Sequence, residues 1–423
     1  MEYKARVVDE MLKIKLKSQG ACVIEGPKWC GKTTTGLHFA SSVLRMDNPA
    51  TREDLLRLSS IDPAFLLQGE APRLIDEWQL APKLWDAVRY EVDQRGKEGQ
   101  FILTGSSVMN DSKDITHSGT GRFTWLKMRT MSLFESLESN GQVSLASLFE
   151  SPSQINGISE LSLDDLAFLA CRGGWPQAID CEKSVALNKA IDYFEGVVKS
   201  DINRVDGTLK NEDRARRVLR SYSRHIGTQA SYTTLLSDIA SNEGSQLGEN
   251  TLANYIQTLK KIYVIENMPA WNPNLRSKVA VRSAETRYFS DPSIAASSLG
   301  IGPSDLKYDL RTFGFLFECL AVRDLRIYVE SLGGTLYHYR DKDNLECDAI
   351  AHLRNGRYGL IEIKLGDELS LEEGAQTLTA LSQKLDTGKM RQPSFLMVLT
   401  GVGKYAYRRE DGIYIVPIGC LRN

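Results

Sequence analysis

The chain has 423 residues, more than one ordinary domain core holds, so we expect about two to four domains. Hydrophobic residues make up 42% of the chain, which is typical of a globular protein. The net charge is only -2, so the chain as a whole is not a basic nucleic-acid-binding protein, and any such surface must be local. Seven cysteines without CxxC pairs favour free thiols in a reducing cytoplasm over a disulfide framework. The sequence shows no signal core and no apolar run of membrane-spanning length, so we expect a cytoplasmic protein without a membrane partner.

The first motif is a glycine-rich loop, Gly26-x-x-x-x-Gly31-Lys32-Thr33. It follows the apolar run Ala21–Ile24 and precedes the helix-compatible run Thr34–Val43, which is the order of a phosphate-binding loop. Lys32 is placed to reach the β- and γ-phosphates, and the Thr33 hydroxyl to ligate Mg²⁺. The predicted ATP-binding residues are Gly26, Pro27, Lys28, Trp29, Cys30, Gly31, Lys32, Thr33 and Thr34. The alternative is a chance match in a glycine-containing turn.

Two adjacent carboxylates, Asp76 and Glu77, end the short apolar strand that begins at Arg73. In open α/β sheets ligands bind at this end of the strands. Asp76 is predicted to hold the Mg²⁺ shell, and Glu77 to orient and polarise the attacking water. The alternative is a solvated acidic turn before a helix over Lys83–Gln94.

The next strand, Phe101–Leu103, ends in hydroxyl residues. Ser106 or Thr104 is the candidate that senses the γ-phosphate or the water, and the alternative is a plain serine and glycine turn. Arg122 is predicted to stabilise transition-state charge, in its own site or in a neighbour's, and Arg129 is the next candidate. The alternative for both is an ordinary surface arginine.

Three stretches together carry a resemblance to a known family: Gly26–Thr34, Leu74–Trp85 with Ile102–Ser107, and Gly121–Ser136. They are similar to bacterial and archaeal AAA-type ATPases whose C-terminal domain is of unknown function. The resemblance covers nearly the whole chain, although Met131–Glu135 lacks the family's usual proline. It implies a P-loop domain with a parallel sheet, ATP and Mg²⁺ as ligands, and a homo-oligomer as a candidate assembly.

The middle of the chain reads as helical, after a Ser, Asn and Gly-rich stretch over 139–164 that predicts a linker or exposed loop. Three helices are expected, the first from Arg214 to Ile226, the second from near Tyr232 to Ala240 and the third over Thr251–Lys261. A strand-like run from Tyr263 to Met268 follows them. This order resembles a winged helix-turn-helix, and its last helix would present Asn254, Gln257 and Lys260 to a major groove. Arg276, Lys278, Arg282 and Arg287 form a basic cluster that predicts phosphate contacts, with DNA as candidate partner. The alternative is a helical packing module.

Near the C-terminus, two strand-like runs, Glu346–Ile350 and Tyr358–Lys364, are joined at Asn355–Gly356, a strong hairpin signal. Asp348 lies on the first strand, and Glu362 and Lys364 share one face of the second. Two carboxylates and a lysine at one point predict a divalent-cation site that activates water. The alternative is an exposed, salt-bridged hairpin.

This arrangement resembles the PD-(D/E)xK nuclease superfamily, with Asp348, Glu362 and Lys364 in the motif positions. Glu318, on a preceding helix-like run, matches an additional acidic position of that superfamily. The predicted metal ligands of the whole chain are Thr33, Asp76, Glu318, Asp348 and Glu362.

We therefore expect an α/β protein with four parts: a P-loop ATPase domain (1–150), a helical linker or lid (151–210), a winged-helix-like domain (211–300) and a restriction-endonuclease-like α/β domain (301–423). The predicted function is a Mg²⁺-dependent ATPase that couples hydrolysis to a nucleic-acid-related C-terminal domain. One alternative is a nucleotide-controlled DNA- or protein-binding switch without nuclease activity. Another is a scaffold that uses ATP only for assembly.

Overall fold

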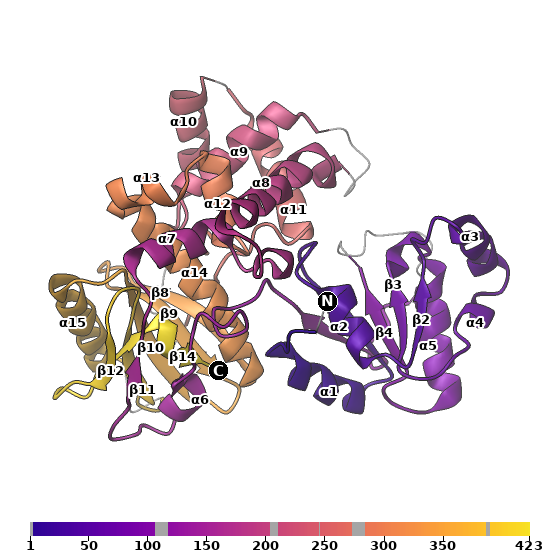
Figure 1. Cartoon of the computed structure of the whole chain (residues 1–423), viewed down its shortest axis with the longest axis horizontal. Coiled ribbons are helices and arrows are strands. Elements are labelled where there is room, and N and C mark those ends of the chain that lie inside the picture. The colour runs from indigo at the N-terminus through magenta and orange to yellow at the C-terminus, as the bar shows by residue number, and fades with distance from the viewer. Residues whose placement is uncertain (1–2, 106–116, 204–209, 245, 273–283, 386–389) are drawn as a thin grey trace. The chain divides into compact units, whose positions relative to one another are not determined.

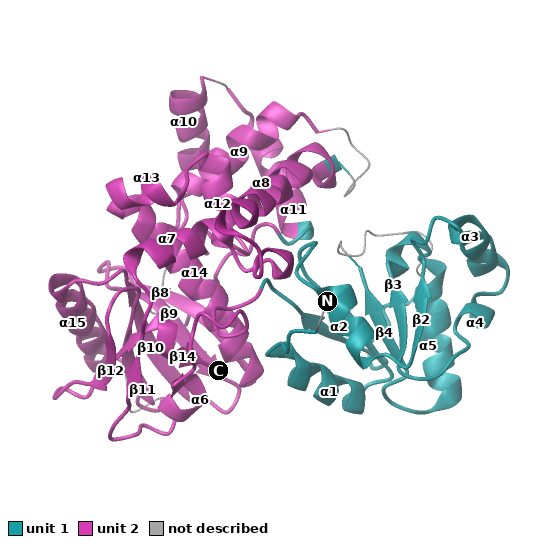
Figure 2. Ribbon diagram, viewed as in Figure 1, with its two compact units in different colours: residues 1–130, 203–208, 261–263 teal, residues 131–202, 209–260, 264–423 magenta. Residues whose placement is uncertain are grey.

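The fold is that of a computed structural model of the chain (Figure 1), which describes residues 3–105, 117–203, 210–244, 246–272, 284–385 and 390–423. The chain forms two compact units (Figure 2). The first contains residues 1–130, 203–208 and 261–263, and the second contains residues 131–202, 209–260 and 264–423. Each unit has a sheet of its own.

The first unit is built on a parallel five-stranded sheet in the order β2-β3-β4-β1-β5, which confirms the predicted parallel α/β fold. Its strands are β1 (Ala21–Glu25), β2 (Ser42–Arg45), β3 (Arg73–Asp76), β4 (Phe101–Thr104) and β5 (Phe123–Lys127). Its helices are α1 (Val8–Ser18), α2 (Lys32–Phe39), α3 (Arg52–Ile61), α4 (Pro63–Leu66), η1 (Trp78–Leu80) and α5 (Lys83–Arg95). The helix expected up to Val43 is shorter, because the chain is extended from Ala40 and β-branched Val43 lies in β2.

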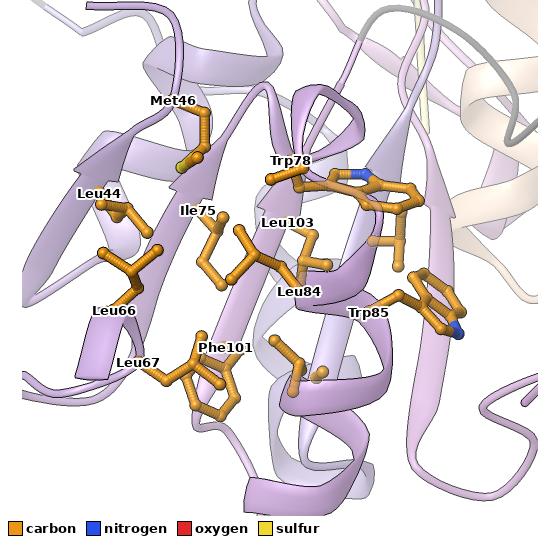
Figure 3. Packing of buried hydrophobic residues seen from close by; sticks show 14 of the residues in the cluster. Leu44, Met46, Leu66, Leu67, Ile75, Trp78, Leu84, Trp85, Phe101 and Leu103 are labelled. Atoms are coloured by element: carbon orange, nitrogen blue, oxygen red, sulfur yellow. The ribbon is translucent and has the colours of Figure 1, made fainter. Parts of the chain in front are cut away.

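Both faces of this sheet are buried, which explains why its strands read as continuous apolar runs. Successive residues of a strand point to opposite faces. Accordingly, Ile75 packs in the cluster with α3, α4 and α5 (Figure 3), whereas its neighbour Leu74 packs in the cluster with α1 and α2. In the first cluster, Trp85 of α5 stacks on Phe123 of β5 with ring centroids 4.0 Å apart. This core fixes where each strand ends, and therefore where the polar residues after the strands lie.

The second unit combines a helical part with a mixed sheet. The helical part contains α7 (Leu163–Arg172), η2 (Pro176–Ala178), α8 (Lys183–Lys199), η3 (Asp201–Asn203), α9 (Glu212–Arg224), α10 (Tyr232–Glu243), α11 (Glu249–Lys261), α12 (Pro292–Leu299) and α13 (Pro303–Tyr308). Four of these helices, α7, α9, α10 and α12, start at a side-chain cap; Ser162, for example, accepts a hydrogen bond from the backbone N–H of Asp165.

The mixed sheet has the order β7-β12-β13-β11-β10-β9-β8. Its strands are β7 (Gly157–Ile158), β8 (Gly334–Arg340), β9 (Glu346–Leu353), β10 (Tyr358–Lys364), β11 (Phe395–Thr400), β12 (Tyr405–Arg408) and β13 (Tyr414–Pro417). Two helices belong to the same part of the chain, α14 (Leu310–Ser331) before β8 and α15 (Glu368–Lys384) between β10 and β11. Strands β8, β9 and β10 are antiparallel neighbours, and β11 joins β10 in parallel. The predicted hairpin between β9 and β10 is confirmed, and Gly356 in its turn has φ 81°.

The stretch 139–164 is not the exposed linker that its composition predicts. It contains β6 (Val143–Ser144), α6 (Leu145–Leu148) and β7, and β6 pairs in parallel with β14 (Leu421–Arg422), which follows η4 (Ile418–Cys420). The hydroxyl of Ser139 donates to the carbonyl of Leu421 at 2.7 Å. Residues 131–150, expected with the ATPase domain, thus pack within the second unit, because their partners are distant in sequence and leave no local signal.

Among the described residues, no helix combines the length and the apolar character needed to cross a membrane.

Candidate functional site

The glycine-rich loop lies between β1 and α2, where the sequence predicts it. Gly26 has φ 153° and Gly31 has φ 105°, backbone conformations that favour glycine. A Cβ at Gly26 would lie 1.9 Å from the carbonyl oxygen of Met128, so no larger residue fits there. The loop runs into the N-terminus of α2, where the helix dipole and unpaired N–H groups favour an anion.

Lys32, the first residue of α2, is buried, with 6% of its surface exposed. Its ammonium group donates to the carbonyls of Gly26 and Pro27, both at 2.8 Å. The charge is therefore held over the loop by two neutral acceptors. Anionic phosphate oxygens are stronger partners for an ammonium group than these carbonyls.

The other predicted loop residues differ in exposure. Pro27 and Cys30 are buried, Lys28 is half-buried, and Thr34 is exposed. Trp29 is 47% exposed and has φ 66°, in the left-handed region that non-glycine residues seldom adopt. Trp29 thus combines an unusual backbone conformation with an exposed indole in the middle of the loop.

Asp76, the last residue of β3, is the point where the loop and the strand ends meet. Its Oδ1 accepts hydrogen bonds from the hydroxyl of Thr33 at 2.9 Å and from the hydroxyl of Thr104 at 2.6 Å. The register explains this convergence, since Thr104 of β4 pairs with Asp76 on one side and with Ile24 of β1 on the other. Of the two sensor candidates, Thr104 thus contacts Asp76, whereas Ser106 lies outside the described residues.

Glu77 follows Asp76 in the left-handed conformation, with φ 55°. The amide of Gln79 donates a hydrogen bond to its carboxylate. Burial raises the pKa of Glu77 above its ordinary value, the Gln79 hydrogen bond opposes this, and the Asp76 charge adds to the rise. Sequence reasoning missed Gln79. The signal was its position two residues after a predicted catalytic carboxylate, on η1.

Arg122 does not lie at this site. It precedes Phe123, which pairs with the first residue of β1, whereas the loop follows the last residue of that strand. At about 3.3 Å per strand residue, Arg122 is roughly 15 Å from the phosphate loop, at the amino ends of the strands rather than at their carboxyl ends. Its guanidinium is paired with Asp93 at 2.8 Å. The prediction that Arg122 serves its own site is therefore wrong, and Arg129, just beyond β5, lies at the correct edge.

The second unit brings together the predicted C-terminal residues. Lys364 lies 2.7 Å from Glu362 Oε2 and 3.6 Å from Asp348 Oδ2. Asp348 Oδ2 also accepts from the backbone N–H of Ile363 at 2.8 Å. Glu318, on α14, accepts a hydrogen bond from the hydroxyl of Tyr288, a residue that sequence reasoning missed.

When all three are ionised, Glu318, Asp348 and Glu362 carry more negative charge than Lys364 balances. Burial, followed by repulsion from the Asp348 carboxylate, raises the pKa of Glu318 and of Glu362 to about 8. Protonation or a bound cation would relieve this repulsion. Yet no group of three or more His, Cys, Asp or Glu side chains in the described parts of the chain is placed to hold a metal ion. The predicted three-carboxylate site is thus not preformed, and Lys364 and Tyr288 contact its carboxylates instead.

The predicted winged-helix region consists of α9, α10 and α11, followed by isolated antiparallel bridges between Ile265 and Phe289 and between Met268 and Thr286. On α11, Asn254 and Gln257 are exposed, as expected. Lys260 is ion-paired with Glu285 at 2.9 Å.

The basic cluster predicted in this region is not available as expected. Arg276, Lys278 and Arg282 lie outside the described residues. Arg287 is buried, donates to the carbonyl of Ala230 at 2.6 Å and lies over the ring of Tyr222, so it is used within the fold. Three of the five arginines of α9 are likewise paired with carboxylates of the same unit, in the pairs Arg216–Glu195, Arg220–Glu243 and Arg224–Asp238.

Comparison with protein families divides the chain into three matches. Residues 18–137 match the model described as AAA domain, which confirms an AAA-type ATPase domain in this part of the chain. Residues 163–305 match a domain of unknown function, DUF8612, and residues 313–421 match another, DUF4143. No curated protein matches the sequence.

Two solved structures show weak similarity. The Walker-type ATPase PABY2304 of Pyrococcus abyssi is 14% identical, with a TM-score of 0.43, over 69% of this chain and 94% of that one. The DNA polymerase III gamma subunit-related protein TM0771 of Thermotoga maritima is 12% identical, with a TM-score of 0.24, over 61% of this chain and 100% of that one.

Proposed function

We propose that this chain binds ATP with Mg²⁺ in the loop from Gly26 to Thr33 and hydrolyses it. The observation that carries the proposal is the meeting of Thr33, Asp76 and Thr104 beside a loop that ends in a buried lysine. Loop, helix N-terminus and carboxylate are the parts that a P-loop ATPase uses for triphosphate and metal. The AAA domain matched over residues 18–137 supports the same reaction.

The residues present suit Mg²⁺. Mg²⁺ prefers oxygen donors and is held by few protein ligands, keeping several waters. The Thr33 hydroxyl and the Asp76 carboxylate are such donors and already contact each other. Bound there, Mg²⁺ would supply charge neutralisation at the β- and γ-phosphates.

The protein groups then have distinct tasks. Lys32 exchanges the carbonyls of Gly26 and Pro27 for phosphate oxygens. Glu77 orients a water and accepts its proton as the water oxygen bonds to the γ-phosphorus and the bond to the ADP oxygen breaks. Gln79 holds the Glu77 carboxylate in place.

The test is the substitution Lys32→Ala, with binding followed by a fluorescent ATP analogue and turnover by phosphate release. Both should be lost, because the cation that balances the triphosphate is removed. Lys17→Ala, on the exposed surface of α1, is the matched control and should behave as wild type. Unchanged turnover in Lys32→Ala would overturn the proposal.

A second candidate function concerns the C-terminal domain. We propose that Asp348, Glu362 and Lys364 are the remnant or the working centre of a metal-dependent nuclease. Supporting observations are the element order α14-β8-β9-β10-α15-β11 and the repulsion of Glu318 and Glu362 by the Asp348 carboxylate, which a bound cation would relieve. A cation would have to displace Lys364 from Glu362.

Labelled DNA and RNA, incubated with Mg²⁺ or Mn²⁺, test this second function. Wild type and Lys32→Ala should cut, and Lys364→Ala should not. If wild type cuts nothing but binds DNA or a protein in an ATP-dependent manner, the chain is instead a nucleotide-controlled switch.

Assembly into a homo-oligomer is proposed from the AAA domain alone, and a neighbour's Arg122 or Arg129 would then be the candidate arginine finger. Sedimentation with and without ATP tests the assembly.

A further inference from the structure

Arg6, which precedes β1, contacts the phosphate loop and has no role in the proposed reaction. Arg6 is the centre of this contact and is only 7% exposed. Its Nη1 donates to the carbonyl of Cys30 at 2.9 Å, and its Nη2 donates to the carbonyl of Arg129 at 2.9 Å. One guanidinium thus joins the loop to the residues that follow β5.

Arg6 is itself held in place. Its backbone N–H donates to Asp9 Oδ2 at 2.8 Å, and the hydroxyl of Tyr3 donates to Asp9 Oδ1 at 2.6 Å. The ring of Tyr3 stacks on His38 of α2, with centroids 3.9 Å apart. The planar guanidinium presents its donors in a fixed fork, which suits two carbonyls at set positions better than a flexible ammonium does.

The phosphate loop packs closely against the residues that follow β5. A Cβ on Gly26 would lie 1.9 Å from the Met128 carbonyl oxygen, and the Cys30 thiol lies 3.6 Å from the same oxygen. Close-packed groups of this kind transmit displacement, since neither side can move alone. A shift of the loop must therefore be shared by residues 128 and 129.

The chain enters the second unit at Met131 and is anchored there within three residues. The backbone N–H of Met131 donates to the carbonyl of Gly174 at 2.7 Å, and that of Leu133 donates to Asp324 Oδ2 at 2.9 Å. Asp324 is paired with Arg323 at 2.8 Å, and both side chains are 1% exposed. The segment 128–133 is thus fixed to the loop at one end and to a buried ion pair at the other.

We propose that Arg6 is a positioning residue of the ATP site, which keeps the phosphate loop in its binding shape and passes nucleotide occupancy into the segment 128–133. The inference rests on the proposed ATP binding. Arg6 acts through the Cys30 carbonyl, at the loop, and through the Arg129 carbonyl, at the exit from β5. When the loop rearranges around a triphosphate, the guanidinium carries the displacement toward Met131 and Leu133.

The test compares Arg6→Gln, Arg6→Lys and the control Lys17→Gln for ATP turnover. In Arg6→Gln, the KM for ATP should rise about tenfold while kcat stays within about threefold of wild type. Arg6→Lys, which keeps a charged donor, should recover part of the loss and guards against a folding defect in Arg6→Gln. A purely structural role would instead lower the active fraction, and so kcat, at constant KM.

The second readout is hydrogen exchange at the amides of Met131 and Leu133, with and without a non-hydrolysable ATP analogue. Wild type and Lys17→Gln should change protection on binding, and Arg6→Gln should not. Arg6→Gln with wild-type KM and wild-type protection changes would overturn this inference alone. Absence of nucleotide binding by wild type would overturn the proposed function and this inference together.

Discussion

The hydroxyl of Thr104 donates a 2.6 Å hydrogen bond to Oδ1 of Asp76, across two neighbouring strands of the parallel sheet. The same oxygen accepts the hydroxyl of Thr33 from the first turn of α2. The two hydrogen bonds thus orient the Asp76 carboxylate before any metal binds. The conformational entropy of fixing this side chain is therefore already lost on folding. Preorganised groups of this kind contribute more to catalysis than groups that must be ordered during the reaction.

Thr104→Val tests this orientation. Valine keeps the shape of the side chain and removes one hydrogen bond to a charged group, so turnover at limiting Mg²⁺ should fall about tenfold. Binding of ATP without Mg²⁺ should stay near the wild-type value. Thr124→Val, on β5 of the same sheet, is the control. Equal turnover of the two variants would show that Asp76 does not need Thr104.

Glu77→Gln separates binding from hydrolysis. The amide cannot accept the water proton, so turnover should fall about 10²- to 10⁴-fold while binding of the fluorescent ATP analogue is kept. Loss of binding would mean that Glu77 holds the loop rather than the water. Phosphate release and analogue titration on the same preparation distinguish the two.

Gln79→Ala should move the acidic limb of the pH–rate profile. A base works only when ionised, and burial raises the pKa of Glu77 above 4.5, so wild-type turnover should decline already above that pH. The Gln79 hydrogen bond lowers this pKa, so its removal should raise the pKa further and shift the limb to higher pH. A limb at unchanged pH would indicate that another group controls turnover.

Much of the nucleotide site was predictable because its signals are local. The glycine-rich loop after an apolar run predicted β1 and α2. The carboxylate pair after another apolar run predicted the end of β3. Arg122 was misplaced although a signal existed, since it precedes its strand and therefore lies at the amino edge. The contact of Thr104 with Asp76 follows from strand order, which a single sequence does not reveal.

The parts that escaped prediction depend on partners far apart in the chain. The pairing of β6 with β14 joins residues separated by most of the second unit, so the polar composition of 139–164 indicated a linker. Arg287 looked like a phosphate ligand by charge alone, but the fold buries it. In the C-terminal domain, alternation on β10 predicted that Glu362 and Lys364 share a face, while the Tyr288 contact with Glu318 required the fold.

The C-terminal carboxylates should make the stability of the second unit depend on pH. The pKa of Glu318 and of Glu362 rises from 4.5 to about 8 on folding. Between these values the folded state holds protons that the unfolded state releases. The free energy of unfolding should therefore fall as pH rises through this range, by at most about 1.4 kcal/mol per pH unit for each proton.

Urea unfolding at several pH values measures this slope. Glu362→Gln should flatten it, because the amide does not ionise, whereas Glu373→Gln on the exposed surface of α15 should not. If the cluster binds a cation, Mg²⁺ or Mn²⁺ should stabilise wild type at pH 8 by mass action and leave Glu362→Gln unchanged. Equal slopes in wild type and Glu362→Gln would contradict the raised pKa.

Arg323→Met should strongly destabilise the second unit. Arg323 lies between Asp291, at 3.2 Å, and Asp324, at 2.8 Å, and all three side chains are at most 1% exposed. Methionine fills a similar volume but leaves both carboxylates buried without their cation. Removing one member of a buried ion pair costs about 3–5 kcal/mol, far more than losing an exposed charge.

The control for this change is Arg311→Met, on the exposed first turn of the same helix, α14. Urea unfolding at pH 7 should show a loss of several kcal/mol for Arg323→Met, on the order of 3–5, and almost none for Arg311→Met. Asp324→Asn should lie between them, because its amide oxygen can still accept from Leu133 while one buried charge disappears. If Arg323→Met is no less stable than Arg311→Met, the buried ion pair does not anchor the chain after Met131.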